Sequence, residues 1–390
     1  MRKMKWLATA LAGAVVLAGC GGGGGADTTP KTSVGSVKIF GDSLMDSGTF
    51  GYKFTIQSAD PANPFQVFPE RIATSFGFSS MCPFFLFNGT TFVANPKAGC
   101  TNYSVAGGRV NNLTNSSAPS NAVPFAIPYQ LGAAATSFAA SDFVIIDGGS
   151  NDLADLTGAY LGATTPAGIG TFIGAITPLV PNAASIVGAA PSASSLGAAG
   201  GAYAQALAAT LVASVKGNVV AKGVGKVLVV NSSDITKTPR FQAVLTGISA
   251  TAGAAQSAAV QSLVQTWTQA YNAALAAGFA GTNVQIFDFY AQGGLIFANP
   301  AQYGITNAST PACPIVAGGI DTVTGQASLS YGVTVAACNS ASMSANIPKG
   351  ETSPNWWKSY GFSDNFHPTP ALHQLIAQSI SVQLAKLGWL

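Results

Sequence analysis

The chain has 390 residues, of which 48% are hydrophobic and only 8% are charged. It carries 17 basic and 14 acidic residues, and three of the basic ones stand at its start: Arg2, Lys3 and Lys5. Without these three the charges balance at 14 basic to 14 acidic, which excludes the strongly basic surface typical of nucleic-acid binding. Because so few residues are charged, the surface of this protein must rely on Ser, Thr, Asn and Gln for its solubility.

Residues 1–19 have the pattern of a cleaved export signal. The basic residues precede an apolar run over 7–17, which is too short to span a bilayer stably. The run ends in Leu17-Ala18-Gly19-Cys20, which resembles the lipobox of bacterial lipoproteins and implies cleavage before Cys20 and lipid on its sulfur and new amine. An ordinary signal peptide with a chance cysteine is the alternative. Because 21–25 are all glycine, we expect residues 20–36 to form a flexible tether.

Gly21, and not an aspartate, follows Cys20, which by the sorting habit of such lipoproteins favours the outer membrane. We therefore expect a lipid-anchored protein of the bacterial cell envelope, on its periplasmic or surface face. Residues 37–390 contain no linker and no fixed-period repeat, so we expect a single domain there.

Short apolar runs, each followed by a polar or glycine-rich turn, look like buried parallel strands. They cover residues 37–40, 143–146, 227–230 and 284–287. Helical patterns lie between and after them, over about 203–220, over 260–275 with Gly278 as the expected C-cap, and after Pro368. This alternation predicts an α/β fold in which helices cover both faces of a central parallel sheet, a three-layer α/β/α sandwich with sites at the carboxyl ends of the strands.

Other segments fit the pattern less well. Residues 158–201 are rich in Ala, Gly, Pro and Ser, and we expect irregular or weakly helical cover over the sheet. Residues 79–101 and 308–348 look like insertions. The four cysteines other than Cys20 allow three disulfide pairings. The nearest-neighbour pairing would close two local loops: Cys82 with Cys100, and Cys313 with Cys338. Metal binding is disfavoured because there is no Cys-x-x-Cys spacing.

A nucleophile candidate follows the first predicted strand, in Gly41-Asp42-Ser43-Leu44. A serine attacks a carbonyl only when a base removes its proton. If Ser43 begins a helix, its own N–H also points toward the reacting carbonyl. Taken alone the string is weak, because a serine in a strand-to-helix turn is often only an N-cap.

The base and its orienting group are offered near the other end, in Asp364-Asn365-Phe366-His367-Pro368. The chain has only 2 histidines, which gives this string weight. Asp364 and His367 lie three residues apart, so the carboxylate can hold the imidazole in one tautomer. We expect Pro368 in the first turn of the last helix. A surface aspartate beside a helix-capping histidine is the alternative.

Oxyanion donors are offered by two further strings. Asn151 lies in Gly149-Ser150-Asn151-Asp152 after the strand at 143–146, and a side-chain amide at a strand end can donate to an oxyanion. Gly107 lies in a run with Gly108, where glycine lets the backbone N–H approach a ligand closely. An Asx-turn and a plain turn glycine are the alternatives.

These strings, in this order, resemble the sequence blocks of the GDSL-type (SGNH) serine hydrolases over nearly the whole region from Val37 to the C-terminal helix. The resemblance implies the flavodoxin-like SGNH fold, with Ser43 as nucleophile, His367 as base and then acid, and Asp364 as its orienter. It implies an oxyanion hole of the Ser43 N–H, the Gly107 N–H and the Asn151 amide, with Gly108 as the alternative to Gly107. No cofactor or metal is expected.

Further residues of interest stand beside these blocks. Arg109 stands where the family often has a small residue, and would place a cation near the site. Asp152 is either a second polar contact or a turn residue. His373 lies beside the apolar stripe of the last helix, and we interpret it as structural. The apolar string over 83–87 would line an acyl pocket or be core under a loop, and we favour core.

The segment over 299–304, with Cys313 following, resembles the secreted phospholipase- or lecithinase-like branch of the family. Together with the predicted membrane anchor, this favours a serine esterase acting on lipid or fatty-acyl esters, and no nucleic-acid partner. A carbohydrate O-deacetylase of the same superfamily is one alternative. A non-catalytic envelope lipoprotein that uses the fold for binding is the other.

Overall fold

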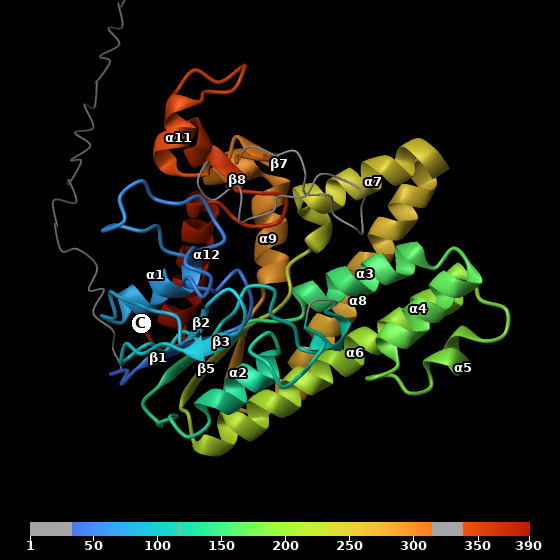
Figure 1. The fold of residues 1–390 in the computed structure, drawn as a ribbon, viewed down its shortest axis with the longest axis horizontal. Helices are drawn as coiled ribbons and strands as arrows, with labels where there is room; N and C mark the ends of the chain where they lie inside the picture. The colour runs from blue at the N-terminus through green and yellow to red at the C-terminus, as the bar shows by residue number, and fades with distance from the viewer. Residues whose placement is uncertain (1–32, 116–117, 314–337) are drawn as a thin grey trace, which may run out of the picture.

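The structure, a computed structural model, describes residues 33–115, 118–313 and 338–390 (Figure 1). The predicted signal segment and most of the tether therefore lie outside the described residues. At its centre is a parallel sheet in the order β1-β4-β5-β6, formed by Val37–Phe40, Phe143–Ile146, Lys226–Val230 and Val284–Phe287. All of its strands were predicted from their apolar runs, and β5 begins one residue earlier than expected.

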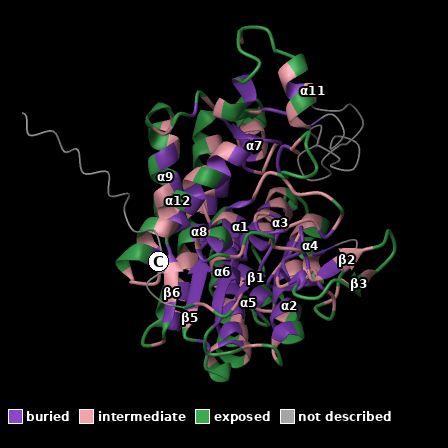
Figure 2. Cartoon of the chain, turned by 90° about the vertical axis from the view of Figure 1, so that its left-hand side faces the viewer, coloured by how far each residue is buried: buried purple, intermediate pink, exposed green. Residues whose placement is uncertain are grey.

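The pleat of these strands divides the core into two layers. Phe40, Ile146 and Val229 belong to one apolar cluster, while their chain neighbours Ile39, Ile145 and Val230 belong to the other. Both faces of the sheet are therefore buried, which explains why its strands are continuous apolar runs and not alternating ones. Figure 2 shows the buried residues gathered on the strands and on the helix faces turned toward them. The three-layer α/β/α fold is confirmed.

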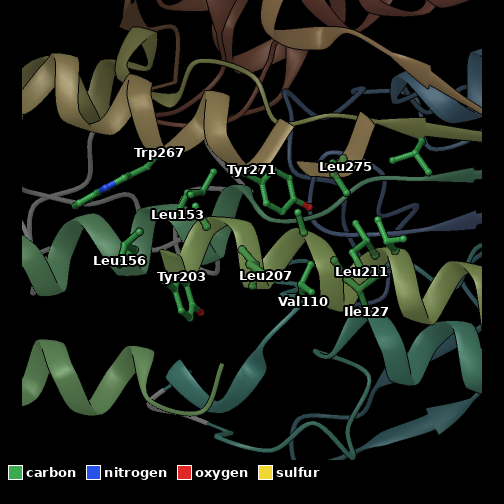
Figure 3. Packing of buried hydrophobic residues seen from close by; sticks show 14 of the residues in the cluster. Val110, Ile127, Leu153, Leu156, Tyr203, Leu207, Leu211, Trp267, Tyr271 and Leu275 are labelled. Atoms are coloured by element: carbon green, nitrogen blue, oxygen red, sulfur yellow. The ribbon is translucent and has the colours of Figure 1, made fainter. Parts of the chain in front are cut away.

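The first cluster is built on α2, α3, α6 and α8, which span Ile127–Ala134, Ser150–Gly162, Ala193–Asn218 and Ala254–Phe279. In Figure 3 the side chains of Leu207 and Leu211 from α6 lie beside Tyr271 and Leu275 from α8. These helices can approach closely because α6 carries glycine at the contact: a Cβ on Gly200 would lie 2.4 Å from the Trp267 ring.

The second cluster is built on α1, α9 and α12, which span Phe68–Ser75, Phe289–Ala298 and Pro370–Lys386. The C-terminal end of the chain lies on this side, beside α1 (Figure 1). There the Trp389 ring packs edge-on against Phe143, with ring centroids 6.0 Å apart.

The remaining elements extend from this framework. The helices α4, α5, α7 and α11 span Pro166–Ile176, Ala183–Val187, Pro239–Ala252 and Ser340–Ala345. Short 3-10 turns cover Asn112–Thr114, Val220–Lys222, Ile235–Lys237, Pro300–Tyr303 and Trp356–Ser359. An antiparallel hairpin joins β2 to β3, Phe85–Phe87 to Phe92–Ala94, and a parallel pair joins β7 to β8, Asn307–Pro311 to Tyr360–Phe362.

Helix boundaries are where the sequence predictions were wrong. The segment over 158–201 is mostly helical, because α4, α5 and the start of α6 lie in it, and α6 begins ten residues before the predicted start. Gly278 is inside α8 and does not cap it; a Cβ there would lie 2.6 Å from Val212, so this glycine serves close helix packing. Pro368 precedes the last helix, which Thr369 caps and Pro370 begins.

The two disulfides join nearest neighbours, Cys82 to Cys100 and Cys313 to Cys338. The first closes the insertion that carries the β2–β3 hairpin. Part of the second predicted insertion, 314–337, lies outside the described residues. Among the residues described, the stretch Ala193–Lys222 is long and apolar enough to cross a membrane, but it includes α6, a packed core helix.

Candidate active site

The two predicted strings from opposite ends of the chain meet at the carboxyl edge of the sheet. Ser43 lies in the turn that leaves β1, and Asp364 and His367 lie in the loop between β8 and α12. His367 Nε2 is 2.8 Å from the Ser43 hydroxyl oxygen, and His367 Nδ1 is 2.7 Å from Asp364 Oδ2. Hydroxyl, imidazole and carboxylate thus form one continuous hydrogen-bonded line.

The loop holds the imidazole by its backbone as well as by its ring. Asp364 Oδ1 accepts the N–H groups of Phe366 and His367, each at 2.7 Å. The His367 carbonyl accepts the Ser363 N–H at 2.8 Å. Burial alone would raise the pKa of Asp364, but the His367 charge and these hydrogen bonds outweigh it and hold the pKa below its ordinary value. The carboxylate is therefore ionised at neutral pH.

The turn that carries Ser43 depends on a glycine. Gly41 has φ +148°, and a Cβ on it would lie 1.6 Å from Asp147 Oδ1. That same oxygen accepts the Asp42 N–H at 2.9 Å, and Asp42 Oδ1 accepts the Leu44 N–H at 2.9 Å. No helix begins at Ser43. Among the described residues, its N–H has no hydrogen-bond partner.

The adjacent glycines Gly107 and Gly108 serve different purposes. Gly107 adopts the left-handed conformation, with φ +80°, and its N–H has no hydrogen-bond partner within the described part of the chain. The Gly108 N–H donates to Val105 O at 2.9 Å. A Cβ on Gly108 would lie 2.6 Å from Gly41 O, so only glycine lets this loop rest on the turn that carries the nucleophile.

Asn151 lies in the first turn of α3, which a short turn over 147–149 connects to β4. Gly149 precedes it with φ +98°, and a Cβ there would lie 2.5 Å from the Tyr271 ring. Asn151 Nδ2 donates to Gly108 O at 3.0 Å and, over a longer 3.3 Å, to Asp42 Oδ2. The amide therefore joins the glycine loop to the nucleophile turn.

These groups surround a pocket of about 340 Å³. One wall of the pocket is aromatic: the Phe54 ring lies against the His367 imidazole with centroids 5.1 Å apart. The lining residues are Ser43, Phe50, Tyr52, Phe54, Ala106, Gly107, Asn151, Ala154, Arg240, Phe366 and His367. Of the five predicted site residues, only Asp364 does not line it, because it stands behind His367.

Comparison with known families agrees with this geometry. The family model of the GDSL-like lipase/acylhydrolases matches residues 37–380. The chain belongs to this family. No curated protein matches it by sequence.

Membership in the GDSL family makes the chain a hydrolase of the lipase/acylhydrolase type. Its fold, a central parallel sheet flanked by helices, is that of the SGNH hydrolases. The blocks that contain Ser43, Asn151 and His367 lie at the same edge of the sheet, at the carboxyl end of β1, after β4 and in the loop before α12.

The charged residues beside the blocks support the site without lining its centre. Arg109 Nε is paired with Asp155 at 2.6 Å, so it does not present a free cation to the pocket. Asp152 is buried and accepts the N–H groups of Val110 and Asn111 at 2.9 and 2.8 Å. Burial raises the pKa of Asp152 to about 6, although these hydrogen bonds oppose the rise.

The second histidine, His373, is fully buried on α12 and accepts the Phe68 N–H through Nδ1 at 3.2 Å. Burial lowers its pKa well below the ordinary value, so it is neutral. This agrees with the structural interpretation of His373.

The aromatic wall was not predicted from the sequence. Phe50, Tyr52 and Phe54 stand at every second position shortly after Gly41–Leu44, and this spacing was the signal in the sequence that could have indicated the wall. The apolar string over 83–87 lies behind this wall: Phe85 is in the core, and the Phe87 ring is 5.4 Å from Phe50. The preference for core over pocket lining agrees with the pocket, which none of its residues lines.

Proposed function

We propose that the protein is a serine esterase that hydrolyses carboxylic esters, of the lipid or fatty-acyl type, through an acyl-enzyme on Ser43. The observation that carries the proposal is the line of hydrogen bonds from Ser43 through His367 to Asp364, which ends at an apolar pocket. A buried carboxylate, an imidazole and a hydroxyl in this order activate the hydroxyl for acyl transfer.

In the first half of the reaction Ser43 Oγ attacks the ester carbonyl carbon, and His367 Nε2 takes the hydroxyl proton. Asp364 holds the Nδ1–H and stabilises the imidazolium. When the tetrahedral intermediate collapses, the C–O bond to the alcohol breaks, and His367 returns the proton to the departing oxygen. A water molecule then attacks the acyl-serine with His367 again as base, which releases the acid and restores Ser43.

The negative charge on the carbonyl oxygen needs donors in place before the reaction. The N–H groups of Ser43 and Gly107 suit this role because neither has a partner in the described structure. Gly107 is a better candidate than Gly108, whose N–H is already donated to Val105. Asn151 contributes its amide by exchanging the 3.3 Å contact with Asp42 for the oxyanion.

The substrate class follows from the lining of the pocket. Phe50, Phe54 and Phe366 give it an apolar wall next to His367, where the acyl group of a bound ester would lie. An acetyl group needs little of this surface, so the wall favours longer acyl chains over a carbohydrate O-deacetylase activity. The resemblance of 299–304 to the phospholipase-like branch points the same way.

We further propose that Cys20 carries the lipid anchor and holds the enzyme at the outer membrane, near lipid esters. Labelling cells with an alkyne fatty acid tests this, with Cys20→Ser as the control. Label on the wild type alone, in the outer-membrane fraction, supports the anchor. Equal recovery of both proteins in the soluble fraction would contradict it.

The substrate proposal is tested with p-nitrophenyl esters of increasing chain length and the form of the protein that starts at Ala26. We expect kcat/KM to rise from the acetate to medium chains. Activity on the acetate alone would refute the lipid assignment. Release of acetate from acetylated polysaccharide, without activity on longer chains, would establish the deacetylase instead. A protein inactive on every ester and unlabelled by a fluorophosphonate would be the non-catalytic lipoprotein.

A further inference from the structure

Arg109 lies two residues after Gly107, which lines the pocket, and each of its three guanidinium nitrogens donates a hydrogen bond. Its Nε and Nη2 donate to the two carboxylate oxygens of Asp155 at 2.6 and 3.2 Å. Its Nη1 donates to the Gly107 carbonyl at 2.6 Å. The side chains of Arg109 and Asp155 are only 17% and 27% exposed, so this fork is shielded from water more than a surface ion pair is.

Gly107 itself has no side chain to fix its conformation. A Cβ at its position would be in ordinary van der Waals contact, 3.7 Å from Arg109 Nη1 and from the Phe125 ring. The groups around it are tied: the Ala106 N–H donates to Asp46 Oδ2 at 2.9 Å, and the Gly108 N–H donates to Val105 O at 2.9 Å. The contact from Arg109 to the Gly107 carbonyl adds a second hold on the peptide group that follows Gly107. The peptide group that carries the Gly107 N–H is thus flanked by held groups on both sides, and this N–H has no partner in the described structure.

Asp155 connects this loop to the helix that carries the other candidate oxyanion donor. It lies four residues after Asn151 on α3, one helical turn further on. Asp155 Oδ2 also accepts the Thr114 hydroxyl at 2.8 Å, so the carboxylate is fixed from two sides. The fork therefore ties the Gly107 carbonyl to the same helix that positions the Asn151 amide.

We propose that Arg109 and Asp155 are positioning residues of the oxyanion hole. Their ion pair fixes the backbone around Gly107, so that the Gly107 N–H and the Asn151 amide can donate to the same oxyanion. The proposal rests on the proposed ester hydrolysis. The charge of Arg109 is balanced by Asp155, so its contribution is geometric and is expressed in the transition state. Loss of the fork therefore lowers kcat and leaves KM nearly unchanged, because the oxyanion forms only as the reaction proceeds.

The test compares Arg109→Leu, Arg109→Lys, Asp155→Leu and the double Leu variant on a p-nitrophenyl ester. We expect kcat to fall about tenfold to a hundredfold in each single variant, the range for a small displacement of a reacting group. Because the two side chains act as one unit, the double variant should be no slower than either single variant. Arg109→Lys should recover little, since an ammonium cannot make the fork.

Two readouts separate positioning from general destabilisation. Millimolar guanidinium should restore part of the kcat of an Arg109→Ala variant, and the rate of fluorophosphonate labelling of Ser43 should fall in parallel with kcat. Arg71→Leu serves as the matched control: this half-buried arginine on α1 donates to Gln66 O at 3.2 Å and does not line the catalytic pocket. It should change stability at most.

An Arg109→Leu protein with wild-type kcat overturns the inference, and so does a loss of kcat that Arg71→Leu reproduces at equal stability. Additive effects in the double variant also overturn it. These outcomes differ from failure of the proposed function, in which the wild type itself hydrolyses no ester and Ser43 takes up no fluorophosphonate.

Discussion

The hydroxyl oxygen of Ser43 and Nε2 of His367 lie 2.8 Å apart although 324 residues separate them in the chain. The sheet brings them together: β1 delivers the serine to its carboxyl edge, and α12, packed on the second face, holds the loop with the histidine at the same edge. Carboxyl ends of parallel strands collect functional groups in this way in open α/β folds.

Asp364→Asn should lower kcat by about 10²- to 10⁴-fold with little change in KM, because an amide no longer holds the imidazole in the required tautomer. Since the pKa of Asp364 is held below 3.8, the carboxylate stabilises the native state above that pH and loses this effect as the pH falls further. Steady-state kinetics from pH 5 to 8 measures the expected loss of kcat in Asp364→Asn. A variant with at least half of the wild-type kcat would show that Asp364 has no part in catalysis.

Gly107→Ala and Gly108→Ala should have different effects on activity and stability, although the two glycines are adjacent. At Gly108 a Cβ would meet Gly41 O at 2.6 Å and Asp42 Cα at 3.1 Å, so the turn that carries the nucleophile must shift and kcat should fall at least about a hundredfold. At Gly107 the penalty is the φ of +80°, with no close contact, and roughly 1 kcal/mol of stability should be lost.

Measuring kcat and the free energy of unfolding for both variants checks this distinction. Gly77→Ala is the control, since Gly77 has φ +90° and open space around it in a surface turn. It should lose a similar amount of stability to Gly107→Ala at unchanged kcat. Equal activity of Gly108→Ala and wild type would contradict the predicted clash.

Phe50→Ala should weaken the preference for long acyl chains. The Phe50 ring lines the pocket and is supported from behind by Phe87 and Phe92 of the β2–β3 hairpin, with centroids 5.4 and 6.0 Å away. Losing it removes apolar area worth roughly 1 to 3 kcal/mol, so the ratio of kcat/KM for the octanoate ester to that for the acetate should fall by about tenfold or more.

A matched control for the aromatic wall is Phe65→Ala, because Phe65 packs against Trp357 away from the catalytic pocket. Its chain-length ratio should equal that of the wild type. If Phe50→Ala keeps the wild-type ratio as well, the acyl group does not lie against this wall.

Asp152 should make part of the stability depend on pH. Its pKa rises from 3.8 to about 6 on folding, so the native state is favoured when the group is protonated, and roughly 3 kcal/mol is lost as the pH rises through this range. Asp152→Asn cannot ionise and removes this dependence. Urea unfolding at pH 4 and pH 7 measures this effect. The free energy of unfolding of the variant, relative to that of the wild type, should be higher at pH 7 than at pH 4 by about that amount. The same difference between the two proteins at both pH values would contradict the raised pKa of Asp152.

The strands and the placement of the candidate site residues could be predicted because both depend on local signals. Strands buried on both faces must be continuous apolar runs, and the run over 143–146 matched β4 residue for residue. The blocks with Ser43 and with Asp364 and His367 are each short strings whose members meet within one loop. Only the contact between the two strings, between Ser43 and His367, depends on the three-dimensional fold.

What could not be predicted depends on partners far away in the chain. Gly278 looked like a helix cap, but it is a packing glycine whose neighbour is Val212 on another helix. The Ala- and Gly-rich segment before residue 203 looked irregular because its small residues have little apolar periodicity of their own. In the structure α6 packs against α8, where Gly200 leaves room for the Trp267 ring. The choice of Gly107 over Gly108 likewise required the hydrogen bond of the Gly108 N–H to Val105.

The nucleophile is tested most directly by mass spectrometry of wild type and Ser43→Ala after treatment with a fluorophosphonate, together with their hydrolysis of a p-nitrophenyl ester. We expect one adduct per wild-type chain, on the peptide that contains Ser43, loss of hydrolysis on labelling, and neither adduct nor hydrolysis in an equally folded Ser43→Ala. An adduct on another residue, or a Ser43→Ala protein that still hydrolyses the ester, would contradict catalysis by Ser43.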